Sequence, residues 1–339
     1  MGVESSQVSI EDIKTIVFNY YGFNVNQVEV FANSSATVYK IYTSNYTYIL
    51  KEVQSQIQEE QIVREIQVCQ YLLQKGYIVP KHIRTIQKKY WLRIRKHFFY
   101  MYEWIAGKPF CKYSGEKKLL EKTSIHYAKL IMDLSDLKIA APQSNIGHCS
   151  KEMVLNSIRN HNKLKNIIND VEVREKIQKK INRIYRLVDK NDYYEKGITY
   201  MLSHGDYNTQ QLLLTDDGRI ATLDFLSVKY MPISFELFRA YIFFARDFVK
   251  GNLDINQLVN YINKFKGFVN LTNEDILQML PMYYYRILLS TFGYEQYALS
   301  SNYNTSKFYL ELGNELYDQM CFVEKYLSAS ESILKLVTR

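Results

Sequence analysis

One histidine and two aspartates lie close enough along the chain to share a site. His204 and Asp206 are two residues apart in Leu202–Leu214, on an irregular segment just before a short apolar strand. Asp224 follows eighteen residues after Asp206, at the end of the apolar run Ile220–Leu223. Burying a carboxylate there is costly unless it binds something. Two carboxylates on neighbouring strand ends suit metal-assisted phosphoryl transfer: one orients or deprotonates a hydroxyl, and the other holds Mg²⁺ on nucleotide phosphates.

A lysine in the first half of the chain could supply the remaining part of such a site. Lys51 lies in the strand-like run Tyr46–Val53, beside apolar Ile49 and Leu50. A strand lysine can reach the α- and β-phosphates if a helix carboxylate fixes it. In the next helix, Glu65 shares a stripe with Val68, Cys69 and Leu72, so we expect it to face inward and to pair with Lys51. Taken alone, Lys51 could be a snorkelling strand lysine and Glu65 part of a solvated face.

The first hundred residues predict a small antiparallel sheet with one helix inserted after its third strand. Alternating β-branched and aromatic residues predict the strands, and helical spacing predicts an opening helix that Ser9 caps. In chain order we expect a helix over 8–21, strands over 28–31, 37–42 and 46–53, a helix over 56–75, and strands over 90–95 and 98–104.

The rest of the chain predicts long helices that one β-hairpin interrupts. The hairpin comprises 211–214 and 220–225, around the turn Asp216-Asp217-Gly218. We expect helices over 115–137, 151–170, 171–190, 234–250, 255–265, 275–297 and 307–336. The pattern predicts an α+β fold with an N-terminal lobe over residues 1–105 and a C-terminal helical lobe over 106–339.

These motifs resemble those of the aminoglycoside phosphotransferase and choline kinase superfamily, which has a protein-kinase-like, two-lobe fold. The resemblance covers most of the chain, in the family's order. Its anchors are Tyr48-Ile-Leu-Lys51, Glu65, Tyr102-Glu-Trp-Ile105, His204-Gly-Asp206 and Thr222-Leu-Asp-Phe225. Within the superfamily, residues 102–107, 153–156 and 204–207 are most similar to CotS-type spore coat proteins.

The resemblance implies a role for each residue of the hairpin region. Asp206 would be the catalytic base for a substrate hydroxyl, and His204 would brace its loop. Asp224 would be the main Mg²⁺ ligand. Gln211 occupies the position of the family's Mg²⁺-binding Asn. The cofactors implied are therefore ATP and Mg²⁺, and the implied partner is a small molecule with a free hydroxyl group.

The resemblance also places the nucleotide in the first lobe. Lys51, paired with Glu65, would hold the phosphates. Glu103, Trp104 and Ile105 would form the hinge whose backbone meets the adenine, and Ser34 and Ser35 lie in the loop expected to approach the phosphates.

Three departures from the family's pattern keep a second function open. The loop 32–36 lacks the glycines that let backbone N–H groups approach phosphate. Gln211 is one methylene longer than Asn, and Leu226 replaces a second acid found in many relatives. We therefore weigh an ATP- and Mg²⁺-dependent small-molecule kinase against a non-catalytic, kinase-like scaffold with spore coat proteins as partners.

Amino-acid composition excludes several other classes of protein. The chain has 339 residues, of which 47% are apolar and 23% charged, which argues against disorder and against membrane spans. The net charge of +8 allows a nucleic-acid partner, but basic residues occur only in scattered pairs, so we expect none. No basic-then-apolar start and no cysteine pairing pattern are evident, so we expect a cytoplasmic protein, or one in a spore coat.

Overall fold

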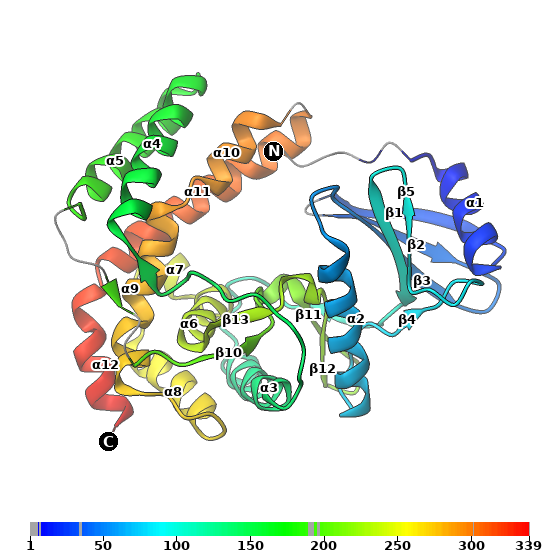
Figure 1. The fold of residues 1–339 in the computed structure, drawn as a ribbon. Coiled ribbons are helices and arrows are strands. Elements are labelled where there is room, and N and C mark those ends of the chain that lie inside the picture. The colour runs from blue at the N-terminus through cyan, green and yellow to red at the C-terminus, as the bar shows by residue number, and fades with distance from the viewer. Residues whose placement is uncertain are drawn as a thin grey trace.

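The computed structural model describes residues 6, 8–33, 36–188, 193–194, 197–300 and 302–338. They form an antiparallel sheet with two helices toward the N-terminus and a larger, mostly helical part (Figure 1). The predicted α+β class and the contrast between the two parts are therefore confirmed.

The N-terminal sheet has six strands, all antiparallel, in the order β1-β2-β3-β6-β4, with β5 paired to β6. The predicted order of helix, three strands, helix and two strands is confirmed; the two-residue strand β4 was not predicted, because it is too short for a pattern. The elements are α1 (Ile10–Tyr21), β1 (Gln27–Asn33), β2 (Ala36–Tyr42), β3 (Thr47–Val53), α2 (Glu59–Gln74), β4 (His82–Ile83), β5 (Trp91–Ile94) and β6 (His97–Glu103).

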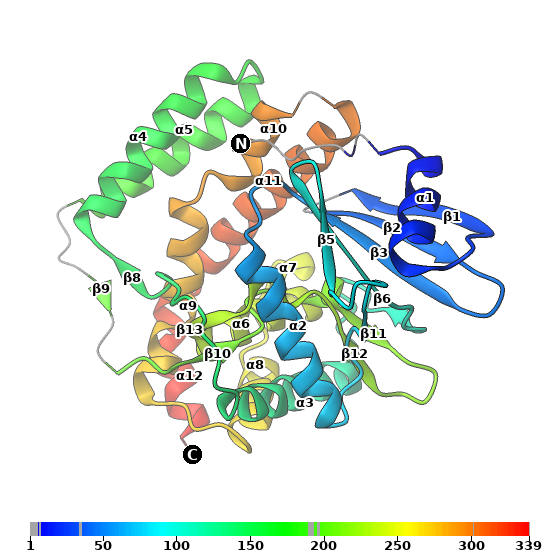
Figure 2. The same cartoon turned by 45° about the vertical axis from the view of Figure 1, so that its right-hand side comes forward.

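Each face of this sheet packs against one helix. Side chains alternate along a strand, so Leu50 packs with Ile13 of α1, whereas Val53 packs with Ile62 of α2. Lys51 has the same parity as Val53 and therefore faces α2. The other side of α2 contributes buried residues to the core of the second part, so this helix links the two parts (Figure 2): Val68, Cys69 and Leu72.

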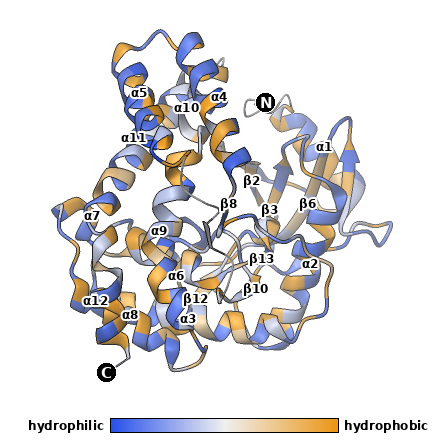
Figure 3. Ribbon diagram, turned by 60° about the vertical axis from the view of Figure 1, so that its left-hand side comes forward, coloured by the Kyte–Doolittle hydropathy of each residue, from blue (hydrophilic) through white to orange (hydrophobic). Residues whose placement is uncertain are grey.

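The second part is built from amphipathic helices around one core (Figure 3). In α8 the buried residues are Leu258, Tyr261, Ile262 and Phe265, which form one helical face. The elements are β7 (Lys108–Pro109), α3 (Lys117–Ser135), β8 (His148–Cys149), α4 (Lys151–Ile167), α5 (Val171–Tyr185), β9 (Tyr193–Tyr194), β10 (Tyr200–Ser203), β11 (Leu212–Leu214), β12 (Ile220–Thr222), β13 (Lys229–Pro232), α6 (Ile233–Phe244), α7 (Asp247–Lys250), α8 (Ile255–Lys266), α9 (Asn273–Leu289), α10 (Phe292–Leu299), α11 (Tyr303–Glu324) and α12 (Ser330–Val337). None of the helices in the described ranges has the length and apolar character needed to span a bilayer.

Short antiparallel pairings lie among these helices: β11 with β12 and β7, β10 with β13, and β8 with β9. The predicted hairpin is confirmed as β11 and β12, with Leu212 opposite Thr222. The second pair, β10 with β13, was not predicted, because its strands are four residues long and 25 residues apart in sequence.

Three predicted helices are wrong in length, since 234–250, 275–297 and 307–336 each divide into two. The break after α9 has a visible cause. The Lys180 amine donates to the carbonyl oxygens of Ile287, at 2.9 Å, and of Ser290. Carbonyl groups at a helix end need such partners, and a distant lysine gives no local signal of where the helix stops.

Candidate active site

The loop after strand β10 is held closely against a neighbouring segment. Ser203, the last residue of β10, lies opposite Lys229 of β13. Gly205 has φ +82°, and a Cβ atom there would lie 1.9 Å from the backbone oxygen of Ser227. Both the left-handed conformation and the lack of space require glycine at this position. The next residue, Asp206, is therefore presented from a tightly constrained turn.

His204 joins this loop to the end of β12. Its Nδ1 accepts a hydrogen bond from the Asp206 backbone N–H at 3.2 Å, so its Nε2–H donates to the Leu223 carbonyl oxygen at 2.8 Å. The ring is fully buried. Because Leu223 directly precedes Asp224, this histidine connects the backbone at the two aspartates.

The Asp206 carboxylate is half-buried, with 30% of its side chain exposed. The Gln211 side-chain amide donates to Oδ2 at 3.1 Å, and the Arg239 guanidinium donates to Oδ1. Arg239 also approaches the Gly205 carbonyl oxygen at 3.5 Å. The carboxylate is thus oriented by two donors and remains reachable from solvent.

Asp224 meets Lys51 across the two parts of the molecule. The Lys51 amine, on a residue only 4% exposed, lies 2.8 Å from Asp224 Oδ1. Burial opposes charge on both groups, but each stabilises the other, so the pKa of Lys51 is raised and that of Asp224 is lowered. Asp224 also has φ +57°. A left-handed residue other than glycine costs about 1–2 kcal/mol, and such strain concentrates at functional sites.

Glu65 is buried and close to this pair, but it does not make the direct bond that we expected. Its carboxylate accepts from the Tyr100 hydroxyl at 2.6 Å, while the Lys51 amine bonds to Asp224. Burial raises the pKa of Glu65, and the Lys51 cation opposes that rise. Glu65 therefore acts on Lys51 through space rather than by contact.

Gln211 and Asp224 lie close together along the hairpin and carry oxygen atoms of the kind that Mg²⁺ takes as ligands. The backbone oxygen of Gln211 accepts from Leu223 N–H at 2.8 Å, which places the glutamine beside Asp224. The side-chain NH₂ group of Gln211 donates to Asp206, so the amide oxygen of Gln211 is not used in that hydrogen bond. Within the described ranges no three His, Cys, Asp or Glu residues gather into a metal site. Mg²⁺ commonly takes one or two carboxylates together with substrate phosphates, so this sparse oxygen set suits it.

The predicted hinge leads out of β6. The Glu103 N–H donates to the Lys81 carbonyl at 3.1 Å, and the Trp104 N–H donates to the Thr47 carbonyl at 3.0 Å. Among the residues described, the Ile105 N–H has no such backbone partner. Of the three predicted hinge residues, Ile105 thus has the N–H group that is available to a ligand.

Two predicted phosphate-loop residues, Ser34 and Ser35, lie outside the described residues. Strands β1 and β2 flank this position and pair through Asn33 and Thr37.

Two charged residues of α6 were missed from the sequence, although they hold the Asp206 loop. Glu236 is fully buried and accepts from the Tyr207 N–H at 2.9 Å and from the Ser203 hydroxyl. Arg239, three residues later, bonds to Asp206. A signal was present: they are the only charged residues in the apolar helix Ile233–Phe244, and a buried charge needs a partner.

A model of the phosphotransferase enzyme family matches residues 27–265. No curated protein sequence matches the chain.

Solved structures with low sequence identity share the fold over nearly the whole chain. A spectinomycin phosphotransferase in complex with ADP and spectinomycin has a TM-score of 0.64 at 15% identity, covering 96% of this chain and 99% of that one. An amicoumacin kinase with AMP-PNP and Ca²⁺ has a TM-score of 0.60 at 15% identity, covering 92% and 94%. The choline kinase LicA from Streptococcus pneumoniae has a TM-score of 0.57 at 12% identity, covering 91% and 98%. The kinase-like, two-lobe fold is thereby confirmed.

Proposed function

Because this chain belongs to the phosphotransferase enzyme family, we propose that it is an ATP- and Mg²⁺-dependent kinase that phosphorylates a hydroxyl group of a small molecule. One observation carries the proposal. Lys51 of the sheet pairs with Asp224, and His204 connects Asp224 to the Asp206 loop. Lys51, Asp224 and Asp206 thereby lie at one edge of the second part, and this arrangement supports their roles as phosphate-binding cation, metal-binding carboxylate and base.

In this proposal each residue of the site has a separate role. Lys51 binds the nucleotide phosphates, and the Ile105 N–H binds the adenine. Asp224 and the Gln211 amide oxygen hold Mg²⁺, which neutralises charge on the phosphates when bound. Asp206 orients the acceptor hydroxyl and takes its proton as the γ-phosphoryl group transfers. The nucleotides in the amicoumacin kinase and spectinomycin phosphotransferase structures support ATP as the donor.

The test replaces Asp206 with asparagine, which keeps the size and removes the base. We expect turnover of ATP with an acceptor to fall by about 10²–10⁴-fold, while stabilisation by Mg·ATP persists. Asp216→Asn, at an exposed turn position, is the matched control. Equal turnover by Asp206→Asn and the parent would exclude Asp206 as the base.

A non-catalytic scaffold is the second candidate, and one observation favours it. Both Asp206 oxygens already accept hydrogen bonds, from Gln211 and Arg239. A scaffold without nucleotide binding predicts no thermal shift with Mg·ATP. A site with a Kd tenfold below the ligand concentration gives about 1.4 kcal/mol of stabilisation. A shift of that size together with turnover would therefore reject the scaffold.

A further inference from the structure

Three cationic side chains near the Asp206 loop act on one another electrostatically. They come from three elements of the second part: Lys229 from β13, Arg239 from α6 and Arg286 from α9. Two carboxylates, Asp206 and Glu236, are their strongest acidic neighbours. Three cations therefore face two anions, which leaves this part of the site one positive charge in excess.

One of these cations contacts the loop directly, and the backbone of a second pairs with the strand that leads into it. Arg239 donates to Asp206 and approaches the Gly205 carbonyl oxygen. Lys229 lies opposite Ser203, the residue at which the loop begins. Its pKa is lowered, first by partial burial and then by Arg286 and Arg239, although Glu236 opposes the shift. Within the described chain, no ion pair neutralises the Lys229 amine.

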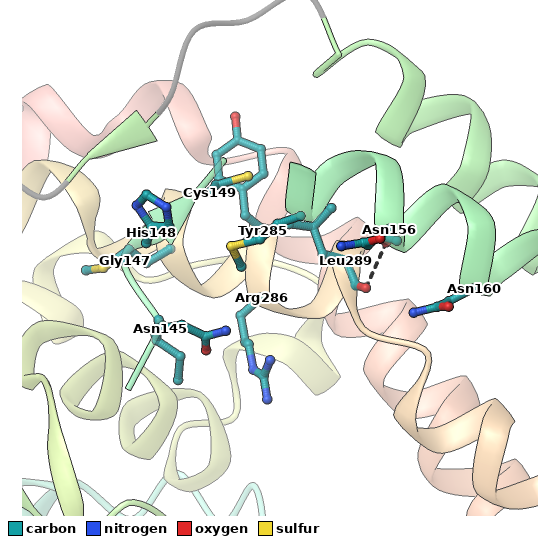
Figure 4. Close-up of a pocket in the computed structure, with 13 residues that line it drawn as sticks. Asn145, Gly147, His148, Cys149, Asn156, Asn160, Tyr285, Arg286 and Leu289 are labelled. Atoms are coloured by element: carbon teal, nitrogen blue, oxygen red, sulfur yellow. Dashed lines mark hydrogen bonds between the residues drawn. The ribbon is translucent and has the colours of Figure 1, made fainter. Parts of the chain in front are cut away.

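Arg286 connects this cluster to a cavity of about 210 Å³ between α4, α9 and the segment before β8. In Figure 4 its side chain extends from α9 at the Asn145 end of the cavity, away from Asn160. Arg286 is exposed to solvent, and the surrounding protein and the neighbouring Arg239 lower the pKa of its guanidinium. No ion pair or hydrogen bond to its guanidinium occurs among the residues described.

The lining of this cavity favours one sign of ligand charge. Its polar groups include three asparagines and Arg286, and none of the described aspartates or glutamates lines it. An ammonium group would meet a guanidinium there with no carboxylate to pair with. A carboxylate or phosphate group would instead form a charge-assisted bond with Arg286, because the planar guanidinium matches both groups.

These cations are separate from the nucleotide-binding lysine. The strongest charges acting on Lys51 are Asp224 and Glu65, whereas those acting on Lys229 are Glu236, Arg286, Arg239 and Asp206. The second cluster is therefore distinct from the charges around Lys51.

We propose that the acceptor is an anion, a small hydroxyl compound that carries a carboxylate or phosphate group which binds Arg286 while its hydroxyl lies at Asp206. This inference rests on the proposed function, since it specifies the substrate class of the same site. Lys229 and Arg239 carry positive charge near Asp206, so they add to the attraction for a negative charge.

The test measures binding of matched compounds in the absence of nucleotide. One set is glycerol, 3-aminopropane-1,2-diol, glycerate and glycerol 3-phosphate; a second is glucose, glucosamine, gluconate and glucose 6-phosphate. We expect calorimetry to detect the anionic members and not the neutral or amine members. Comparison of glycerate and gluconate with the phosphates identifies which anion the site takes. Amine members that bind more tightly, or no binding by any anionic member, overturn the proposal.

Variants locate the binding point. Arg286→Gln should raise the Kd of the anionic compound by about tenfold or more, as loss of a charged hydrogen bond implies, and Arg286→Lys should restore part of the affinity. Arg174→Gln, on the exposed face of α5, is the control. An unchanged Kd in a folded Arg286→Gln variant overturns the assignment. Binding is read without ATP, so absence of turnover would reject the proposed kinase activity and leave the charge of the ligand as a separate result.

Discussion

Replacing Glu236 tests whether α6 holds the Asp206 loop in place. The carboxylate is fully buried and accepts from three donors: the Tyr207 N–H at 2.9 Å, the Tyr127 hydroxyl at 3.0 Å and the Ser203 hydroxyl. Leucine has a similar size and accepts nothing, so Glu236→Leu removes all three bonds. Glu236→Gln removes the charge and keeps one acceptor oxygen, while its NH₂ group replaces the other.

The expected loss in unfolding free energy depends on which donors Glu236→Leu leaves without an acceptor. A buried N–H left without an acceptor costs about 1–3 kcal/mol, which applies to Tyr207. The Ser203 and Tyr127 hydroxyls lie 2.9 Å apart and can bond to each other, so they lose only the charged acceptor. Arg239 also loses an anionic neighbour. Together we expect Glu236→Leu to lower the free energy of unfolding by about 3–5 kcal/mol, as breaking a buried ion pair typically does, and Glu236→Gln by about 1–3 kcal/mol.

Urea unfolding followed by circular dichroism measures these losses, with Glu331→Gln on the exposed face of α12 as the control. The same variants test the link to activity. Because Tyr207 directly follows Asp206, a displaced loop should lower kcat by about 10²-fold and leave the KM for ATP nearly unchanged. If Glu236→Leu unfolds at the same urea concentration as the control, the argument that this carboxylate holds the loop is refuted.

Gly205→Ala should destabilise the fold and abolish turnover, because its Cβ would lie 1.9 Å from the Ser227 oxygen; Gly251→Ala shares a positive φ but has open space, so equal unfolding midpoints for the two variants would contradict the clash. Burial lowers the pKa of Lys180 to about 7 from an ordinary 10.5. Between those values the unfolded chain binds more protons, so unfolding free energy measured from pH 7 to 9 should rise with pH, by at most about 1.4 kcal/mol per pH unit. The rise should vanish in Lys180→Met and persist in Lys179→Met, and a flat parent curve would oppose the assignment.

The sequence predicts the site best where local periodicity carries the information. Strand alternation orients Lys51 toward α2, and the stripe of apolar residues around Glu65 predicts its burial. The partner of Lys51 does not follow from such patterns. Asp224 is 173 residues away along the chain, and only the packing of the sheet against the second part brings the two together. Period and composition therefore predict which side chains face inward, but not which of two nearby carboxylates the lysine binds.

Helix α6 shows why part of the site could not be predicted. Its pattern is that of a buried helix, and ten of its twelve residues are uncharged, so spacing alone says nothing of a site. The partners that explain Glu236 and Arg239 lie on the loop after β10, whose pairing with β13 also gave no local signal. Only the charges of Glu236 and Arg239 indicated a functional role in the sequence. A buried charge without a partner is strongly destabilising, so each must have a partner elsewhere in the fold.

The three-residue spacing of Glu236 and Arg239 gives α6 two distinct connections to one loop. Residues three apart lie on the same face of a helix. Glu236 binds the backbone at Tyr207, and Arg239 binds the side chain of Asp206. The loop backbone and the carboxylate of the proposed base are therefore both held from one helix. The guanidinium groups of Arg286 and Arg239 repel each other. An anion bound to Arg286 would offset this repulsion and so change the charge around Arg239. Acceptor binding would thereby change the environment of the base through α6 rather than through the nucleotide side of the site.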